Sequence, residues 1–189
     1  MHILRGLLPW LIALATVLSS HTQAAWLAEP EATMGSLKLP KEFAFSPGEP
    51  HENSLAAVGL GFQGGYEFAN HLFLKAGGVN GETENLLGWQ DRIKFHDAHI
   101  ATGINWPLSK RWQLSGAVGL SHWSFTAKDQ ASFQKNVAET HFSGTDAEYR
   151  LGTQLQFNRL ISMGLFGGEK HWGDVRYVHY GLSLIMRFE

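Results

Sequence analysis

Apolar and polar residues alternate one by one through much of this chain. In the segment AEYRLGTQLQF (147–157), Tyr149 and Leu151 share one parity, whereas Glu148 and Arg150 share the other. The last ten residues, YGLSLIMRFE, repeat the pattern up to the end of the sequence. Successive side chains of a β-strand point to opposite faces, so a period of two predicts strands with one apolar and one small or polar face.

Seven segments show this alternation, and the connections between them differ in length. The segments are 54–68, 71–80, 97–108, 111–127, 145–157, 160–170 and 177–188. Short links (ANH, SKR and NR) alternate strictly with longer polar links, of which those around 80–95 and 128–144 are the longest and EKHWGDVR (169–176) is more modest. This order is typical of an antiparallel meander with tight turns at one end and long loops at the other, as in outer-membrane barrels.

An eighth strand is expected because bacterial single-chain barrels have an even number of strands. It should lie between Trp26 and Phe45, where TMGSLKLPKEFAF is the candidate, although Pro40 interrupts it. We therefore predict an all-β fold, an eight-stranded antiparallel up-and-down transmembrane β-barrel.

The composition of the two faces favours a membrane barrel over a soluble one. A membrane barrel turns its apolar face to lipid and fills its lumen with polar groups, whereas a soluble barrel does the reverse. Here the faces opposite the apolar ones are rich in Gly and Gln, a poor choice for contact with bulk water but suitable for a narrow lumen. A soluble lipocalin-like binder remains the alternative from another class of protein.

The N-terminus has the features of a cleaved secretory signal. Arg5 precedes the apolar run GLLPWLIALATVL, and small residues follow at Ala24 and Ala25. We expect residues 1–25 to be removed and 26–189 to form the barrel domain. No later segment is apolar for 18 residues, which argues against transmembrane helices, and a net charge of −2 gives no reason to expect a nucleic-acid partner.

Aromatic residues gather near the ends of the predicted strands. Two aromatic belts are typical of the two interfaces of a bilayer. We predict interfacial anchors on both sides, with the principal candidates being Trp106, Trp112, Trp123, Trp172 and Tyr177.

Five charged residues occupy the alternate strand positions that should face the lumen: Glu67, Lys75, Glu148, Arg150 and Arg187. Because an unpaired buried charge is costly, we expect them to pair across the barrel. The pairs would form a structural plug, or alternatively a narrow, porin-like ion path gated by exchange of salt bridges.

The histidines give little support for a metal or catalytic site. His96 and His99 lie three residues apart, which places them on opposite faces of a strand. His122 and Ser124 share a face, as the base and nucleophile of an outer-membrane lipid A deacylase do. That face should meet lipid, however, and Glu139, the candidate acid, is expected in a loop. We predict no enzyme activity, metal or cofactor, with a lipid-modifying enzyme as an alternative.

The segments FHDAHIATGINWPLSKRWQLSGAVGLSHW and GTDAEYRLGTQLQFNRLISMGLF resemble strand–turn–strand units of the OmpA-like transmembrane β-barrel family. The resemblance covers about 55–188 and implies an eight-stranded barrel without a wide pore or catalytic activity, in the outer membrane of a Gram-negative cell. Members commonly end in Phe, which the barrel-assembly machinery reads; here Phe188 precedes Glu189, and Tyr180 begins the same apolar face.

Function is then expected at the external loops, because recognition usually lies on loops carried by a rigid scaffold. The two longest links contain apolar side chains among charges: Leu86, Leu87, Trp89, Phe133, Val137 and Phe142. We expect the protein to be a structural and surface-interaction scaffold. Its partners would be outer-membrane lipid and lipopolysaccharide, the assembly machinery, and a host or phage surface ligand.

Overall fold

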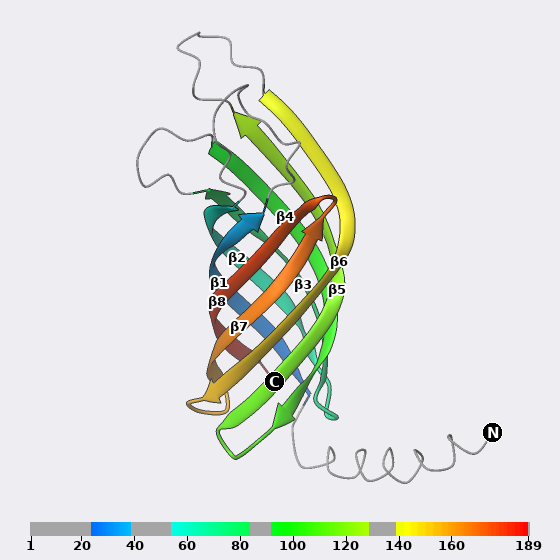
Figure 1. The fold of residues 1–189 in the computed structure, drawn as a ribbon. Coiled ribbons are helices and arrows are strands. Elements are labelled where there is room, and N and C mark those ends of the chain that lie inside the picture. Colours follow the sequence, from blue (N-terminus) through cyan, green and yellow to red (C-terminus); the bar gives the residue numbers. More distant parts are fainter. Residues whose placement is uncertain (1–23, 39–53, 84–91, 129–138, 189) are drawn as a thin grey trace, which may run out of the picture.

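The computed structural model describes residues 24–38, 54–83, 92–128 and 139–188. These residues form eight strands: β1 (Ala25–Lys38), β2 (Ser54–Glu67), β3 (Leu72–Thr83), β4 (Arg92–Pro107), β5 (Trp112–Lys128), β6 (Glu139–Gln156), β7 (Ile161–Trp172) and β8 (Val175–Phe188). Each strand pairs antiparallel with its neighbours in the sequence, and β8 returns to pair with β1 (Figure 1). The predicted fold, a closed eight-stranded antiparallel barrel, is confirmed. In the described part of the chain, no helix has the length and apolar character needed to cross a membrane.

The first strand begins earlier than the sequence suggested. It runs from Ala25 to Lys38, so it ends before Pro40 and contains Pro30. Pro30 has no N–H to donate, and it is tolerated because the ladder between β1 and β8 is interrupted at this position. The predicted candidate was therefore displaced toward the C-terminus and missed Glu29 and Glu31.

Several strands also extend beyond the predicted boundaries at one end of the barrel. β4 begins at Arg92 and β6 at Glu139, and both extensions take up residues that were expected in loops. The link between β7 and β8 is a turn at Gly173 and Asp174, with Gly173 at a φ of 60°, so this connection is short rather than moderately long. The predicted signal peptide, apart from its last two residues, and the loop residues Leu86, Leu87, Trp89, Phe133 and Val137 lie outside the described residues.

The outer surface of the barrel is a continuous apolar band. Leu60 is 71% exposed and Leu151 is 69% exposed, and similarly exposed apolar side chains occur on every strand. Soluble monomers rarely expose an apolar surface that surrounds the whole molecule. The inner face instead carries buried Glu, Gln, Lys, Asn and Ser side chains, so the predicted assignment of the two faces holds for the described strands.

Two inner-face glycines make room for aromatic rings rather than for polar chains alone. A Cβ on Gly81 would lie 2.2 Å from the ring of Phe95, and one on Gly181 would lie 2.3 Å from the ring of Phe166. A side chain at either position would displace the ring that covers it. These close approaches explain why glycine occurs within these strands.

β5 and β6 form a ribbon that extends past β7 and β8, while the other edge of β5 stays paired with β4 up to Arg92 (Figure 1). β6 pairs with β5 from Glu139 onward, but its pairing with β7 begins only at Glu148. Among the residues that the structure describes, 139–147 therefore pair with β5 but not with β7. This end also holds the long links, so it is the external end by the usual arrangement of outer-membrane barrels.

Candidate functional site

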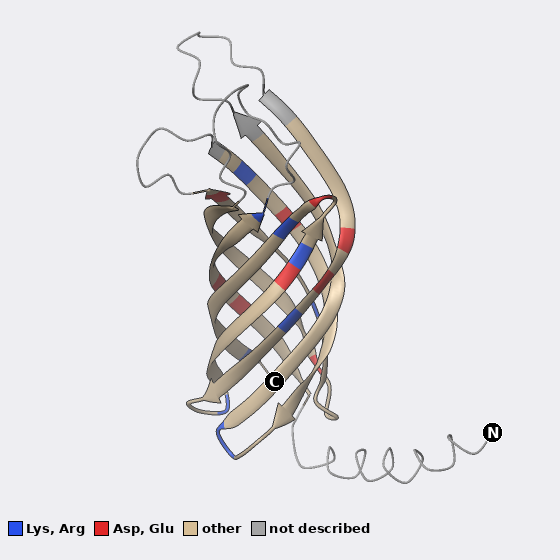
Figure 2. Cartoon of the chain, in the orientation of Figure 1, with Lys and Arg blue, Asp and Glu red and all other residues tan. Residues whose placement is uncertain are grey.

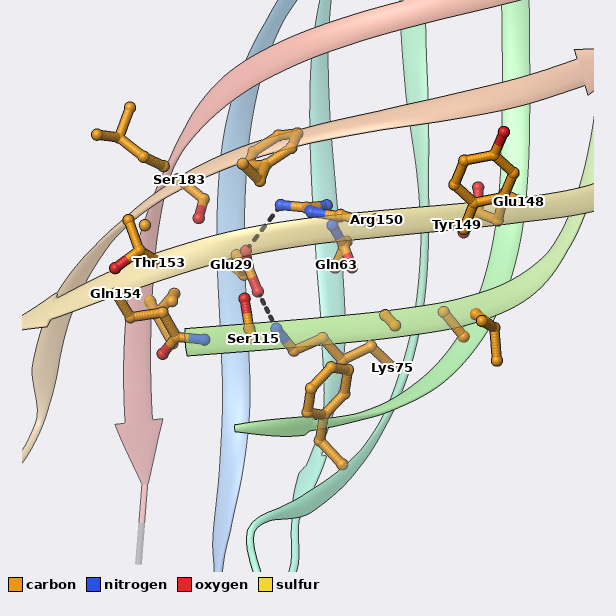
Figure 3. Close-up of a pocket in the computed structure, with 18 residues that line it drawn as sticks. Glu29, Gln63, Lys75, Ser115, Glu148, Tyr149, Arg150, Thr153, Gln154 and Ser183 are labelled. Atoms are coloured by element: carbon orange, nitrogen blue, oxygen red, sulfur yellow. Dashed lines mark hydrogen bonds and ion pairs between the residues drawn. The ribbon is translucent and has the colours of Figure 1, made fainter. Parts of the chain in front are cut away.

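The inner face holds three layers of paired charges, of which the central layer joins β1, β3 and β6. Lys75 Nζ lies 2.5 Å from Glu29 Oε2, and the Arg150 guanidinium lies 3.2 Å from Glu29 Oε1 and 2.7 Å from Glu31 Oε2 (Figure 3). Gln63 donates to the same oxygen of Glu31 at 2.6 Å. Two carboxylates of β1 are thus balanced by two cations from β3 and β6, neither of which is a neighbour of β1 in the sheet.

The second layer lies toward the short turns and is centred on Arg187. Its Nε lies 3.1 Å from Glu67 Oε2, and its two terminal nitrogens donate to Ser162 Oγ at 2.6 Å and Gln154 Oε1 at 3.1 Å. Asn105 donates to Glu67 and accepts from Gln154. Because each polar group has a partner, this layer links five strands through side chains.

The third layer lies on the external side and contains Lys170. Its Nζ lies 2.6 Å from Asp97 Oδ1 and 2.7 Å from Glu148 Oε2. Ser121 also donates to Asp97, and His99 Nδ1 lies 2.8 Å from it. In the described residues, Asp97, His99 and Glu148 are the three whose donor atoms approach closely enough for a metal, within 4.8 Å. The ammonium of Lys170 already supplies a positive charge between the two carboxylates, so the arrangement does not call for a metal.

All five charged residues predicted for the lumen lie on the inner face, where Glu67, Lys75 and Glu148 are buried and Arg150 and Arg187 partly buried. The structure does not bring them together as one cluster but distributes them over the three layers. Sequence reasoning missed three of their partners, Glu29, Glu31 and Lys170, and also missed Asp97, which pairs with Lys170. Glu29 and Glu31 could have been found from the alternation in LAEPEAT, which gives them one parity.

Two small cavities lie between the layers in the part of the lumen that the structure describes. One cavity of about 40 Å³ is lined by the central layer together with Phe73, Ser115 and Phe166 (Figure 3). A second, of about 20 Å³, lies beside the third layer and is lined by His179 and Tyr177. Each has room for one or a few water molecules. The described lumen is therefore a packed polar core rather than an open channel.

An apolar cluster closes the inner face at the external end. Trp172 stacks on Tyr177 with ring centroids 5.0 Å apart, and Trp172 also contacts Phe95 and Trp123. The cluster, which we call the aromatic cap, comprises Leu37, Leu55, Ala57, Val79, Ile93, Phe95, Trp123, Phe125, Trp172, Val175 and Tyr177, with Phe142 packed against it.

The prediction of interfacial anchoring is wrong for three of the five principal aromatics. Trp172 is 1% exposed, Tyr177 is 2% exposed and Trp123 is 6% exposed, all within the aromatic cap, so none faces lipid. Phe142, which was expected in a loop, belongs to β6 and stacks on Phe125 at 4.9 Å. These rings lie inside because they occupy the alternate strand positions that point to the inner face.

One hydrogen-bonded clamp ties the aromatic cap to the projecting ribbon. Asp146 of β6 accepts from the indole N–H of Trp123 at 2.8 Å and from the backbone N–H of Gly173 at 2.9 Å. The Gly173 N–H, and then the Trp123 N–H, lower the pKa of the Asp146 carboxyl because both donors favour the charged form. The β7–β8 turn is thereby attached to β6 beyond the end of their ladder.

The other predicted aromatics lie on the outer face near the short turns. Trp112 is half-exposed and Trp106 partly exposed, and neighbouring rings of Trp26 and Tyr66 meet edge-on at 5.1 Å. Tyr180 and Phe188 also face outward from β8. This face therefore carries an aromatic girdle at the end opposite the aromatic cap.

His122 and Ser124 do not belong to a catalytic arrangement in the described residues. Both lie on the outer face of β5, and His122 Nδ1 lies 3.0 Å from Thr145 Oγ1. Glu139 pairs in register with Lys128, four positions along β5 from Ser124, a separation of roughly 13 Å at 3.3 Å per residue. His96 and His99 lie on opposite faces, as predicted.

Comparison with solved structures finds 52 chains that match. Neisserial surface protein A (NspA) superposes with a TM-score of 0.68 at 9% identity, covering 88% of this chain and 100% of that one. Ail, the attachment invasion locus protein of Yersinia pestis, gives 0.57 at 15% identity, covering 89% and 100%. The N-terminal β-barrel domain of Pseudomonas aeruginosa OprF gives 0.52 at 14% identity, covering 88% and 100%.

At these identities the likeness is one of fold, and a search of curated proteins finds no match. A family model for the outer membrane protein beta-barrel domain matches residues 10–182, which is most of the chain. That match agrees with the closed barrel, its apolar outer band and its polar interior. The chain belongs to the outer membrane protein β-barrel family.

Proposed function

We propose that this protein is a non-enzymatic scaffold of the bacterial outer membrane that presents a recognition surface outside the cell. The observation that carries the proposal is the projecting β5–β6 ribbon, where residues 143–147 of β6 pair with β5 but with no second strand among those that the structure describes. An exposed sheet edge is a template for an added strand, because its N–H and C=O groups seek partners.

The register identifies which residues face the open edge. The N–H of Gln156 donates to the C=O of Arg111 on the β5 side, and the β5–β6 register continues without a bulge to Glu139. Backbone groups alternate in direction along a strand, so even-numbered residues of β6 bond to β5. The odd-numbered residues Ser143 and Thr145 therefore direct their N–H and C=O groups to the side that faces away from β5.

The interior supports a structural rather than a transport role. Three layers of ion pairs and the aromatic cap fill the described lumen, and its cavities measure about 40 and 20 Å³. This packing does not favour an ion path, and the position of His122 and Ser124 does not favour hydrolysis. A barrel of this architecture can hold a ligand, since Ail has been solved in complex with the heparin analogue sucrose octasulfate.

Other contacts follow from the same placement in the membrane. We propose that Tyr180 and Phe188, on the outer face of β8, form the signal read by the barrel-assembly machinery. Trp106 and Trp112 would anchor the barrel at the periplasmic interface. The outer polar residues at the external end would meet lipopolysaccharide, and residues 84–91 and 129–138 would extend the recognition surface toward a host or phage ligand.

The open edge can be tested with proline substitutions. Ser143→Pro and Thr145→Pro each remove a backbone donor from the open side and leave the bonds of the even-numbered residues to β5 in place. We expect both variants to remain heat-modifiable barrels on gels but to lose binding of intact bacteria to host cells by several-fold. Ser143→Ala and Thr145→Ala are the matched controls and should bind as the unaltered protein does.

Two outcomes would contradict the proposal. Bacteria that carry either proline variant, or a deletion of residues 130–137, could still adhere to host cells as the unaltered strain does. In that case the external end is not the recognition surface. Ion conductance of the purified protein in planar bilayers, altered by Arg150→Ala, would place the function in the lumen instead.

A further inference from the structure

The periplasmic rim of the barrel carries an unusual charge distribution. Its three turns are formed by residues 68–71, 108–111 and 157–160. Within them, the exposed charged side chains are Lys110, Arg111 and Arg159, and no exposed acid occurs there (Figure 2). The described external end differs, because exposed Lys38, Lys94 and Arg176 are accompanied there by acids such as Asp174 and Glu82.

The three cations lie on two turns that touch each other. The N–H of Gln156, at the end of β6, donates to the C=O of Arg111 at 2.8 Å, and this bond joins the β6–β7 turn to the β4–β5 turn. In the third turn the ionisable side chain is His71, which is buried. The positive charge is therefore concentrated on one side of the rim, over β4 to β7.

Side-chain caps fix both turns and hold these cations in place. Ser109 Oγ accepts from the N–H groups of Arg111 and Trp112 at 3.4 and 3.1 Å. Asn158 Oδ1 accepts from the N–H groups of Leu160 and Ile161, both at 2.8 Å. Such caps are the local hydrogen bonds that rigidify short turns.

Exposed apolar side chains stand directly beside the cations. Leu108 and Trp112 flank the first turn, and Phe157 and Leu160 flank the second; each is between 46% and 62% exposed. Long cationic side chains next to interfacial aromatics are suited to the level of lipid headgroups, where the apolar stem contacts acyl chains and the charge meets phosphate. Water alone would not favour four exposed apolar residues at this place.

We propose that this basic rim, Lys110, Arg111 and Arg159, binds the phosphodiester headgroups of anionic phospholipids in the periplasmic leaflet. The attraction of a cation to an anionic lipid surface is worth about 1 kcal/mol for each Lys or Arg, which corresponds to about a five-fold preference per residue. The rim would therefore recruit anionic lipid to one side of the barrel. This inference depends on the outer-membrane location but not on what the external end recognises.

The test uses the full barrel refolded into vesicles and the native tryptophans as reporters. Phosphatidylglycerol or phosphatidylcholine with brominated acyl chains quenches tryptophans that it contacts, such as Trp106 and Trp112, and the quenching gives the relative binding constant of the two lipids. We expect phosphatidylglycerol to be preferred at least about five-fold at low salt. The preference should fall toward one at high salt, because ions screen exposed charges.

The variant Lys110→Gln/Arg111→Gln/Arg159→Gln should abolish the preference, whereas the control Lys38→Gln/Lys94→Gln, at the external end, should keep it. No preference in the unaltered protein, or an equal preference in the triple variant, would overturn the proposal. If the protein shows no lipid selectivity but cosediments with purified peptidoglycan, the basic rim binds the cell wall instead, and the proposal is overturned. If the triple variant does not refold, the salt dependence of the unaltered protein still decides, because a salt-independent preference contradicts the proposal.

Discussion

Each charged residue of the barrel interior is stabilised by a partner that lies far away in the sequence. Arg150 meets Glu29 across a separation of 121 residues and Glu31 across 119. Local alternation could predict that Arg150 faces inward, but it contains no information about which carboxylate lies opposite. The choice of partner depends on strand tilt and register around the closed barrel, which the sequence pattern does not specify.

At the residue scale, Arg150→Ala should be strongly destabilising. The change leaves Glu29 with Lys75 and the hydroxyl of Ser183, and leaves Glu31 without a cationic partner beside the amide of Gln63. Breaking a buried pair by removing one partner costs about 3 kcal/mol or more. The loss can be measured as a change in the free energy of unfolding by urea in lipid vesicles. Arg150→Lys keeps the charge and should recover part of it.

Lys38→Ala is the control, because Lys38 is exposed at the end of β1 and lies outside the layers of ion pairs and the basic rim. Surface substitutions of this kind usually change stability by less than about 0.5 kcal/mol. If Arg150→Ala and Lys38→Ala cost the same, the central layer of ion pairs contributes nothing to the stability of the barrel.

At the scale of the strand, parity was the reliable signal and boundaries were not. The outward residues of β5 are even-numbered from Trp112 to Thr126, so the odd number of Trp123 already places it inside. The prediction of an interfacial Trp123 gave more weight to aromatic character than to parity. The early starts of β4 and β6 escaped detection because the outer faces become polar there, at His96 and Ser143. In β4 the alternation is reversed rather than lost, with Ile93 and Phe95 on the inner face.

The same strand face allows a test of membrane depth. Leu151 pairs in register with Gly116 and Gly167 near the middle of the apolar band, whereas Leu155 pairs with Trp112 beside the β4–β5 turn. Leu151→Arg should cost about 2–4 kcal/mol, as arginine does at the bilayer midplane, and Leu155→Arg only about 0–1 kcal/mol. Unfolding free energies in vesicles measure both.

Gln156→Ala serves as the inner-face reference, since Gln156 lies next to Leu155 but on the other face, and it should cost less than Leu151→Arg. Equal costs for Leu151→Arg and Leu155→Arg would mean that the apolar band does not follow the bilayer as described here.

At the scale of the whole molecule, the two ends of the barrel differ in chemistry. One end is closed inside by the aromatic cap and extends into the β5–β6 ribbon, while the other has tight turns, an outer aromatic girdle and exposed cations. Strand order and the alternation of link lengths predicted this polarity from the sequence. The aromatic cap was not predicted, because it joins residues from β1 to β8 that no local pattern connects.

The orientation that both proposals require can be measured directly, because the chain contains no cysteine. Asp174→Cys introduces a thiol in the exposed β7–β8 turn, and Ser109→Cys introduces one in the exposed β4–β5 turn at the opposite end. A polymer-linked maleimide too large for porins should label the thiol at position 174 on intact cells. It should label the thiol at position 109 only after the outer membrane has been permeabilised, because that turn faces the periplasm. The reverse result would place the projecting ribbon inside the cell envelope and the basic turns outside, contradicting both the proposed recognition surface and the proposed lipid contact.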